Sequence, residues 1–202
     1  LDLIIEEILT NIIKYAYKNQ EGLIKLLKYI KGLPTGVING KTYKFLNNVG
    51  FGIDGYCCEV ADIQKAKSDK PINYTGIAVK GLLFYFKPRD AKVTIDGVTR
   101  EFKHVWLAPV MKGKYYGGGM IPCPEQSRNN KTLSCLIWHS GNKMKTLVNF
   151  AKIFEGKHIE KKKMCEVFTG SEFVIEFAKP CAAQVDGETV LNVSKVEVKI
   201  NK

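Results

Sequence analysis

The sequence lacks the cysteine spacing of a zinc ribbon and the apolar run of a membrane-spanning helix. None of its 6 cysteines forms a Cys-x-x-Cys pair, and its histidines, His104, His139 and His158, are not spaced as metal ligands. No uncharged run approaches the roughly 20 apolar residues that a spanning helix needs. The sequence also shows no signal peptide. We therefore predict reduced cysteines and a cytoplasmic location, with at most peripheral contact to a membrane.

The sequence also lacks an initiating methionine. It begins Leu1-Asp2-Leu3 and enters an apolar helical pattern at once, so we expect it to be part of a longer protein. A length of 202 residues allows one domain, or one and a half. We expect a helical segment over 1–35, as a remnant of or linker to a missing domain, and a second domain over 36–202.

The formal net charge of +11 indicates an anionic partner, which could be nucleic acid, a phosphorylated small molecule or an acidic membrane surface. Lysines and aromatic residues do not interleave on one expected sheet, which argues against nucleic acid. A basic cluster near the end of the chain fits either solvated surface or an anionic bilayer, where each lysine contributes about 1 kcal/mol. Its members are Lys143, Lys145, Lys152, Lys157, His158, Lys161, Lys162 and Lys163.

Helical periodicity marks the start of the chain, at 3–17 and 21–31, and returns three times further on. The later helices are expected through Cys57–Ala61, over 72–86 and over 143–155. In the last of them, five apolar side chains share a face: Met144, Leu147, Val148, Ala151 and Phe154.

Strands dominate the rest of the chain. An Asn-Gly turn joins two strands within Val37–Tyr43, and the returning strand is expected to continue to Val49. Further strands are expected at 91–96, 98–103, 104–111, 132–138, 164–169, 172–178, 181–186 and 193–200. Mainly antiparallel strands, with N-terminal helices and one inserted helix, predict an α+β chain whose later part is a β-sandwich.

An Asp-Gly turn followed at once by an acid lies at the end of Ala182–Glu188. Asp-Gly between strands is a two-residue hairpin signal, because glycine adopts positive φ without strain. Asp96-Gly97 provides an internal control, which we interpret as a hairpin alone. Glu188 distinguishes the later turn, since a plain hairpin does not need it. A surface turn and a functional carboxylate both remain open at this point.

Two further motifs have both a structural and a functional interpretation. Three consecutive glycines, Gly117, Gly118 and Gly119, cost backbone entropy, so the loop either is flexible or brings bare backbone close to a ligand. It is not a Walker loop, because the Gly-Lys-Ser/Thr ending is missing. Asp54 follows a strand and precedes a helix, where a carboxylate is either an N-cap or a contact for a ligand hydroxyl or amine.

Three motifs together resemble the diacylglycerol kinase catalytic-domain family, which includes sphingosine, ceramide and bacterial lipid kinases. The motifs are Phe45–Asp54, then Gly117–Met120 with Pro124, and last Gln184–Glu188. Their order and spacing match the second half of that family, over about residues 40–200. The resemblance implies a two-domain kinase with its active site in the cleft between the domains, in which this chain is the C-terminal β-sandwich and the Gly-Gly-Asp-Gly-Thr nucleotide motif lies in the first domain.

The resemblance also implies roles for single residues. Glu188 would be the catalytic proton acceptor, and a carboxylate is suited to take the proton of a lipid hydroxyl that attacks a γ-phosphoryl group. Asp186 would shape the turn or help hold Mg²⁺, and Asp54 would contact the lipid headgroup. ATP and Mg²⁺ would be the cofactors, bound mainly by the missing domain. The expected partners are a membrane lipid and an anionic membrane surface, and a homodimer through an exposed strand edge stays open.

One departure from the family concerns a metal site. Bacterial members continue after the Gly-Gly-Gly-Met and Pro to an Asp-Gly whose Asp helps bind a structural Mg²⁺. This chain has Asn130-Lys131 there, and the lysine would repel a cation, so we expect no metal at this place. The departure keeps a second hypothesis open, a non-catalytic lipid- or membrane-binding module. A third, an NAD-kinase-like enzyme, is disfavoured by the Gly-Gly-Gly-Met stretch.

Overall fold

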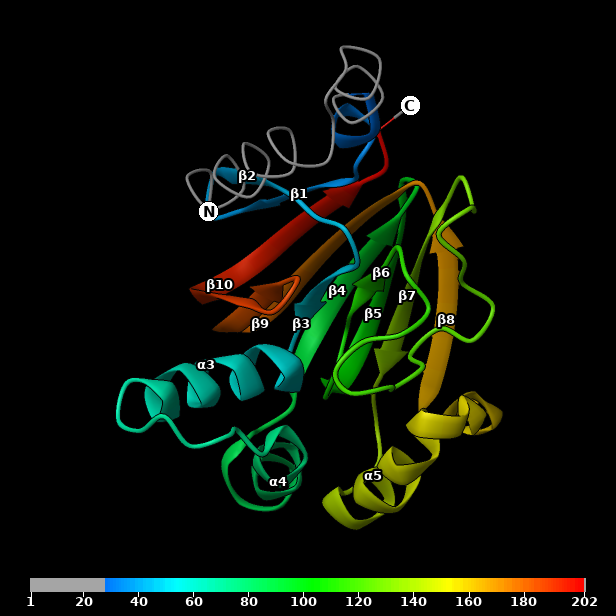
Figure 1. Ribbon diagram of the computed structural model, residues 1–202. Coiled ribbons are helices and arrows are strands. Elements are labelled where there is room, and N and C mark those ends of the chain that lie inside the picture. The colour runs from blue at the N-terminus through cyan, green and yellow to red at the C-terminus, as the bar shows by residue number, and fades with distance from the viewer. Residues whose placement is uncertain (1–27, 202) are drawn as a thin grey trace. The chain divides into compact units, whose positions relative to one another are not determined.

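The structure, a computed structural model, describes residues 28–201 (Figure 1). The chain divides into two units: residues 1–33 with 201–202, and residues 34–200. Of the first unit, residues 28–31 are helical, which agrees with the end of the helix expected over 21–31. The helix expected over 3–17 lies outside the described residues. The second unit, called here the sandwich unit, contains all the motifs singled out above.

The strands of the sandwich unit pair antiparallel throughout, which confirms the expected fold class. The strands are β1 (Thr35–Ile38), β2 (Lys41–Lys44), β3 (Asn48–Phe51), β4 (Arg89–Ile95), β5 (Val98–Val105), β6 (Val110–Met111), β7 (Leu133–Trp138), β8 (Cys165–Gly170), β9 (Glu172–Val185) and β10 (Glu188–Lys199). Their order is β2-β1-β10-β9-β3-β6-β7-β8, and β4 pairs with β9 and β5 beside this path.

Strand β9 joins the two layers of the sandwich. Its first half pairs with β4 and its last three residues pair with β3, while β10 follows it along nearly its whole length. The change of partner comes near Pro180, which cannot donate a hydrogen bond to a neighbouring strand, and β10 shifts register between Val190 and Lys195. The strands expected separately at 172–178 and 181–186 are therefore one long strand that crosses from layer to layer.

The core between the two layers is almost wholly apolar. Phe51 of β3 stacks on Phe177 of β9 with ring centroids 4.1 Å apart, and Phe102 of β5 meets Phe168 of β8 edge to face. Such aromatic pairs add to the free energy of burial, which is roughly 25 cal/mol per Å² of apolar surface. This core holds the two layers in place and thereby fixes the position of the turns at their ends.

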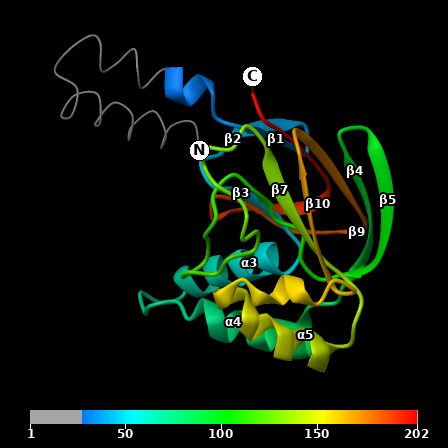
Figure 2. The same cartoon turned by 90° about the vertical axis from the view of Figure 1, so that its right-hand side faces the viewer.

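Helices cover the outer face of the layer that contains β6, β7 and β8, and together with these strands they form a second core. They are α3 (Ile53–Lys65), α4 (Tyr74–Lys80), the π-helical segment η1 (Gly81–Tyr85), α5 (Lys143–Phe150), and the 3₁₀ segments η2 (Ala151–Glu155) and η3 (Lys157–Glu160). Strand β7 is buried on both sides, with Cys135 and Ile137 in the first core and Leu136 and Trp138 in the second. Figures 1 and 2 show α3, α4 and α5 gathered at one end of the sandwich unit.

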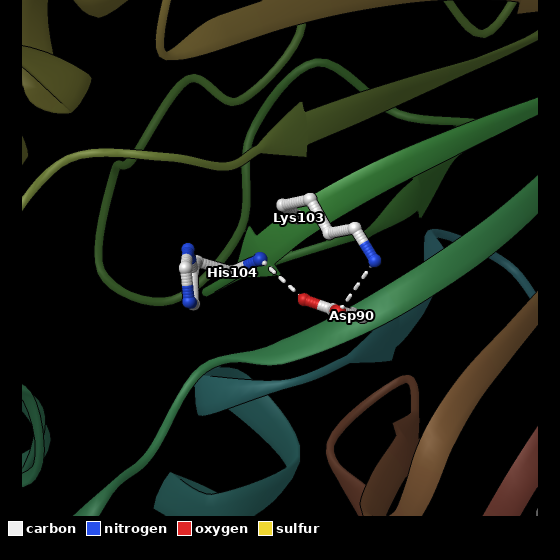
Figure 3. Close-up of polar contacts among 3 residues, drawn as sticks. All are labelled: Asp90, Lys103 and His104. Atoms are coloured by element: carbon white, nitrogen blue, oxygen red, sulfur yellow. Dashed lines mark hydrogen bonds and ion pairs between the residues drawn. The ribbon is translucent and has the colours of Figure 1, made fainter.

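Three local predictions were wrong. The strand expected to continue to Val49 breaks at residues 45–47, and the strand expected over 104–111 is reduced to Val110–Met111. The expected helix 143–155 changes from α5 to the 3₁₀ segment η2 at Ala151. A β-bulge lies at the boundary expected between the strands 98–103 and 104–111, and β5 continues through it to Val105. Lys103 and His104 both lie opposite Asp90, and His104 has φ of 53°. Figure 3 shows the Asp90 carboxylate accepting from Lys103 Nζ at 2.9 Å and from the His104 amide at 3.0 Å.

The cysteines Cys57, Cys58, Cys123, Cys135, Cys165 and Cys181 are all free in the structure. Across residues 28–201, none of the helices combines the length and the apolar character that crossing a bilayer requires.

Candidate functional site

A cavity of about 580 Å³ opens where the helices meet the end of the sheets. Its walls come from α3, α4, η2, the triple-glycine loop and the turn between β9 and β10. Three motifs that are far apart in the sequence meet here, because Asp54, Gly117, Gly118, Asp186 and Gly187 all line it. Seven of the sixteen other lining residues are apolar: Ile53, Ile72, Ala78, Leu107, Met120, Phe150 and Phe154.

Asp54 is not the N-cap of α3. The cap position is Gly52, which has no side chain to cap the helix, and Asp54 follows in the first turn of the helix. Its Oδ1 accepts from the amide of Gly55 at 2.9 Å and its Oδ2 accepts from Gln184 Nε2 at 3.4 Å. Burial raises the pKa of the Asp54 carboxyl from 3.8 to about 6, although these hydrogen bonds oppose the rise. The capping interpretation was therefore wrong, and the carboxyl is a partly buried group of the cavity wall.

Glycines let the elements around Asp54 approach closely. A Cβ on Gly50 would lie 1.7 Å from Asp54 Oδ2, and one on Gly55 would lie 2.1 Å from the carbonyl oxygen of Ala182. Both distances are far below any real contact, so α3 packs on β3 and β9 only because side chains are absent there. This packing places the Asp54 carboxyl against Gln184.

The Asp186-Gly187 turn is anchored by the carboxylate of Asp186. With φ of 49° and 97°, the two residues form the hairpin turn that the sequence predicts. The carboxylate accepts from the amides of Leu46 at 2.5 Å, Asn47 at 2.9 Å and Asn48 at 2.9 Å. These bonds fit the role of shaping the turn, which is one of the two roles expected for Asp186.

The control turn uses the same device. Asp96 has φ of 45°, and its carboxylate accepts from the amides of Ser171 at 2.9 Å and Glu172 at 2.8 Å. In both Asp-Gly turns, therefore, the aspartate holds a neighbouring segment of the chain. The acid at position 188 is what distinguishes the later turn.

Glu188 is exposed and does not line the cavity, but it directly follows Gly187, which does. It pairs with Val185 across the hairpin, so its side chain leaves the strand on the face opposite to Gln184. Burial raises the pKa of the Cys58 thiol to about 12, and the carboxylates of Asp54, Asp62 and Glu188 add to that rise. Cys58 lines the cavity, so the negative charge of Glu188 influences a group of the cavity wall although Glu188 itself is not part of that wall.

The triple-glycine loop forms a tight turn. Its ends pair, with Tyr116 and Met120 each donating an amide hydrogen bond to the other's carbonyl oxygen at 3.0 Å. Gly117, Gly118 and Gly119 have φ of 49°, 79° and 101°, a left-handed run that side chains disfavour. The loop thus presents bare backbone to the cavity at Gly117 and Gly118.

Two polar residues of the cavity wall lie within the motifs singled out above but were assigned no role there. Gln184 is buried and links the site, because its Nε2 donates to Asp54 while its Oε1 accepts from the amide of Gly187 at 2.8 Å. Asn48 is also buried, and its Nδ2 has no partner among the described residues. Either amide looks like an ordinary strand residue in the sequence, and their roles depend on contacts with distant segments.

The basic cluster is only partly a surface feature. His158 is fully buried, stacks on Trp138 with centroids 5.7 Å apart, and has Nε2 3.0 Å from the carbonyl oxygen of Pro122. Burial lowers its pKa, so including it among surface cations was wrong. Lys157 pairs with Glu155 at 2.6 Å.

The ammonium group of Lys112 lies beside Asn130-Lys131, where we expect no metal site. Lys112 Nζ donates to the carbonyl oxygen of Asn130 at 2.5 Å, and Asn130 Nδ2 donates to Gln126 Oε1. Burial lowers the pKa of Lys112, and the nearby Arg128 adds to this. Over the described residues, no three Asp, Glu, His or Cys side chains come together as a metal-binding group.

Comparison with known proteins decides the family. The profile of the YegS C-terminal NAD kinase beta sandwich-like domain matches residues 47–200. The chain belongs to this family. The match runs from just before β3 to the end of the sandwich unit, so it includes the triple-glycine loop and the Asp-Gly-Glu turn, and it confirms the resemblance drawn from the three motifs.

Relatives of this YegS-type domain carry kinase names. "Putative lipid kinase YtlR" of Bacillus subtilis (strain 168) is 28% identical over 125 residues, 56% of this chain and 38% of that protein. "Diacylglycerol kinase" of Mycobacterium tuberculosis (strain ATCC 25618 / H37Rv) is 29% identical over 84 residues, 42% of this chain and 27% of that protein. A crystal structure from Bacillus anthracis, a "putative diacylglycerol kinase", has a TM-score of 0.59 at 17% identity, over 89% of this chain and 56% of that one. The chain therefore spans less than two thirds of each.

Proposed function

We propose that this chain is the lipid-binding half of an ATP-dependent kinase that phosphorylates a hydroxyl group of a membrane lipid, such as diacylglycerol. The observation that carries the proposal is the cavity, whose apolar wall ends on the Asp54 carboxyl beside the Asp-Gly-Glu turn. An apolar wall suits acyl chains, and a few convergent polar groups suit a headgroup. The names of the relatives support the kinase class.

In this proposal each polar group of the cavity makes a different contact with the lipid headgroup or positions a group that does. Asp54, with its pKa of about 6, accepts a hydrogen bond from a headgroup hydroxyl, and Gln184 holds that carboxyl in place. The unpartnered Nδ2 of Asn48 is available to donate to a headgroup oxygen. The bare backbone at Gly117 and Gly118 allows a ligand to approach closely.

Glu188 is the proposed proton acceptor. Its carboxylate takes the proton from the lipid hydroxyl as the hydroxyl oxygen bonds to the γ-phosphorus of ATP and the bond to the β-phosphate oxygen breaks, releasing ADP. Glu188 is exposed and follows Gly187 of the cavity wall, and a carboxylate outside that wall suits this role, because the phosphate donor must approach from outside the cavity. Mg²⁺ neutralises phosphate charge in such transfers. We expect the rest of the protein to hold ATP and Mg²⁺, and we propose no metal site at Asn130-Lys131.

The test compares Glu188→Gln with Glu101→Gln in the full-length protein. Glu101 is also an exposed strand glutamate, on β5, and serves as the matched control. Phosphoryl transfer from ATP to diacylglycerol in mixed micelles should fall about 10²–10⁴-fold in kcat for Glu188→Gln only. The melting temperature should not change in either variant. Unchanged turnover in Glu188→Gln would remove Glu188 from the mechanism, and we expect the 202-residue chain alone to show little turnover.

A second candidate function is lipid binding without catalysis. The observation that favours it is that Glu188 stands outside the cavity wall while the apolar cavity itself is intact. Full-length protein that binds diacylglycerol but shows no transfer from ATP under any divalent-metal condition would support this alternative.

A further inference from the structure

Helix α5 exposes two of its large apolar side chains and buries two polar ones, while Leu147 and Phe150 pack partly buried against the second core. Met144 and Val148 are 61% and 68% exposed, whereas Thr146 and Asn149 are buried at 1% and 4%. A surface helix of a globular protein ordinarily does the reverse. Hydrogen bonding explains the inversion only in part. Asn149 Nδ2 donates to the carbonyl oxygen of His158 at 3.4 Å and to Cys165 Sγ at 3.5 Å, but Thr146 Oγ1 and Asn149 Oδ1 have no partners among the described residues. The face expected to share apolar residues is therefore formed, but much of it points to solvent.

The neighbouring segment η1 extends this apolar exposure. Phe84 and Tyr85 are 68% and 67% exposed, and Lys143 Nζ, at the start of α5, donates to the carbonyl oxygen of Leu83 at 2.8 Å. Figures 1 and 2 place α4, which leads into η1, and α5 at the same end of the sandwich unit. We call Phe84, Tyr85, Met144 and Val148 the apolar end face. Exposed apolar residues grouped in this way mark interaction surfaces, unlike single ones.

The segments that carry the apolar end face are basic and contain no acid. Neither residues 70–89 nor residues 140–154 include an Asp or a Glu. Their cations are Lys70, Lys80, Lys87, Arg89, Lys143, Lys145 and Lys152. Apolar side chains flanked by cations are the pattern of proteins that lie on an anionic membrane surface.

The mouth of the cavity lies beside the same segments. Tyr74 of α4 and Phe154 of η2 both line the cavity, and both remain about two fifths exposed, at 45% and 41%. A lipid that leaves a bilayer at this end of the unit would meet the cavity without crossing the polar surface.

We propose that the apolar end face docks on an anionic lipid bilayer, with Phe84, Tyr85, Met144 and Val148 in the headgroup region and the flanking lysines on lipid phosphates. Docking turns the mouth of the cavity toward the source of its ligand, a step that rests on the function proposed above. Adsorption itself needs neither ATP nor turnover, so it is tested separately.

The test measures binding of the full chain to phosphatidylcholine vesicles with and without phosphatidylglycerol. We expect binding to the anionic vesicles, weakening as salt is added. Val148→Ser should weaken it about tenfold, whereas Val98→Ser, at an exposed valine on β5, should not. Lys145→Gln should weaken it about fivefold, and Lys92→Gln on β4 should not.

Tryptophan fluorescence gives a direct readout of insertion. Trp106 and Trp138 are buried and should respond little. The emission of Val148→Trp should shift to the blue on anionic vesicles, while that of Val98→Trp should not.

Three outcomes would overturn the proposal: no binding to either vesicle, equal binding by Val148→Ser and Val98→Ser, or a homodimer in solution that Val148→Ser dissociates. Vesicle binding by a full-length protein that never phosphorylates lipid would leave docking standing and remove the kinase. Turnover of a soluble short-chain lipid without vesicle binding would do the opposite.

Discussion

Replacing Asp54 by asparagine should change how the stability of the protein depends on pH. The folded carboxyl has a pKa of about 6 and the unfolded one about 3.8, so between these values the folded state holds more protons. The contribution of this group to the free energy of unfolding is therefore largest at low pH and is lost as pH rises through 6. The difference in pKa corresponds to about 3 kcal/mol well above pH 6, as an upper bound.

Asparagine is neutral at every pH and has one acceptor oxygen in place of two. It loses the hydrogen bond from either Gln184 or the Gly55 amide, which costs about 1 kcal/mol at all pH values. Asp54→Asn should thus be slightly less stable than the parent at pH 4 and about 2 kcal/mol more stable at pH 7.5. Urea unfolding across this pH range measures the difference, with Asp69→Asn, at an exposed loop position, as the control. A stability difference for Asp54→Asn that does not vary with pH would refute the burial argument.

Two further predictions concern groups that hold the fold around the site. Asp186→Ala and Asp96→Ala each remove a carboxylate that anchors backbone amides, so each should cost about 1–2 kcal/mol in urea unfolding; a neutral result for Asp186→Ala would free that carboxylate for another role. Burial lowers the pKa of His158 below 6.5, so its share of stability is lost as pH falls below that value. His158→Gln should flatten this acid-side loss in thermal melts, and an identical pH profile would show that the imidazole does not titrate on unfolding.

Local rules in the sequence predicted the turns well. Asn39-Gly40, Asp96-Gly97 and Asp186-Gly187 all adopt positive φ, because these dipeptides tolerate the left-handed region that two-residue hairpins require. The three kinase-like motifs indicated the family. Each of these signals resides in a few consecutive residues, so the sequence alone was sufficient.

Contacts between distant segments decided the rest. The sequence left Asp54 open between a helix cap and a ligand contact, and only packing against distant segments, among them Gln184 130 positions away, buries the carboxyl and raises its pKa. His158 looked like one cation among lysines until packing on Trp138 buried it. The apolar face of α5 was predictable from its period, but the direction in which it points was not, because a helical period specifies which side chains share a face and the surrounding layers specify what that face meets.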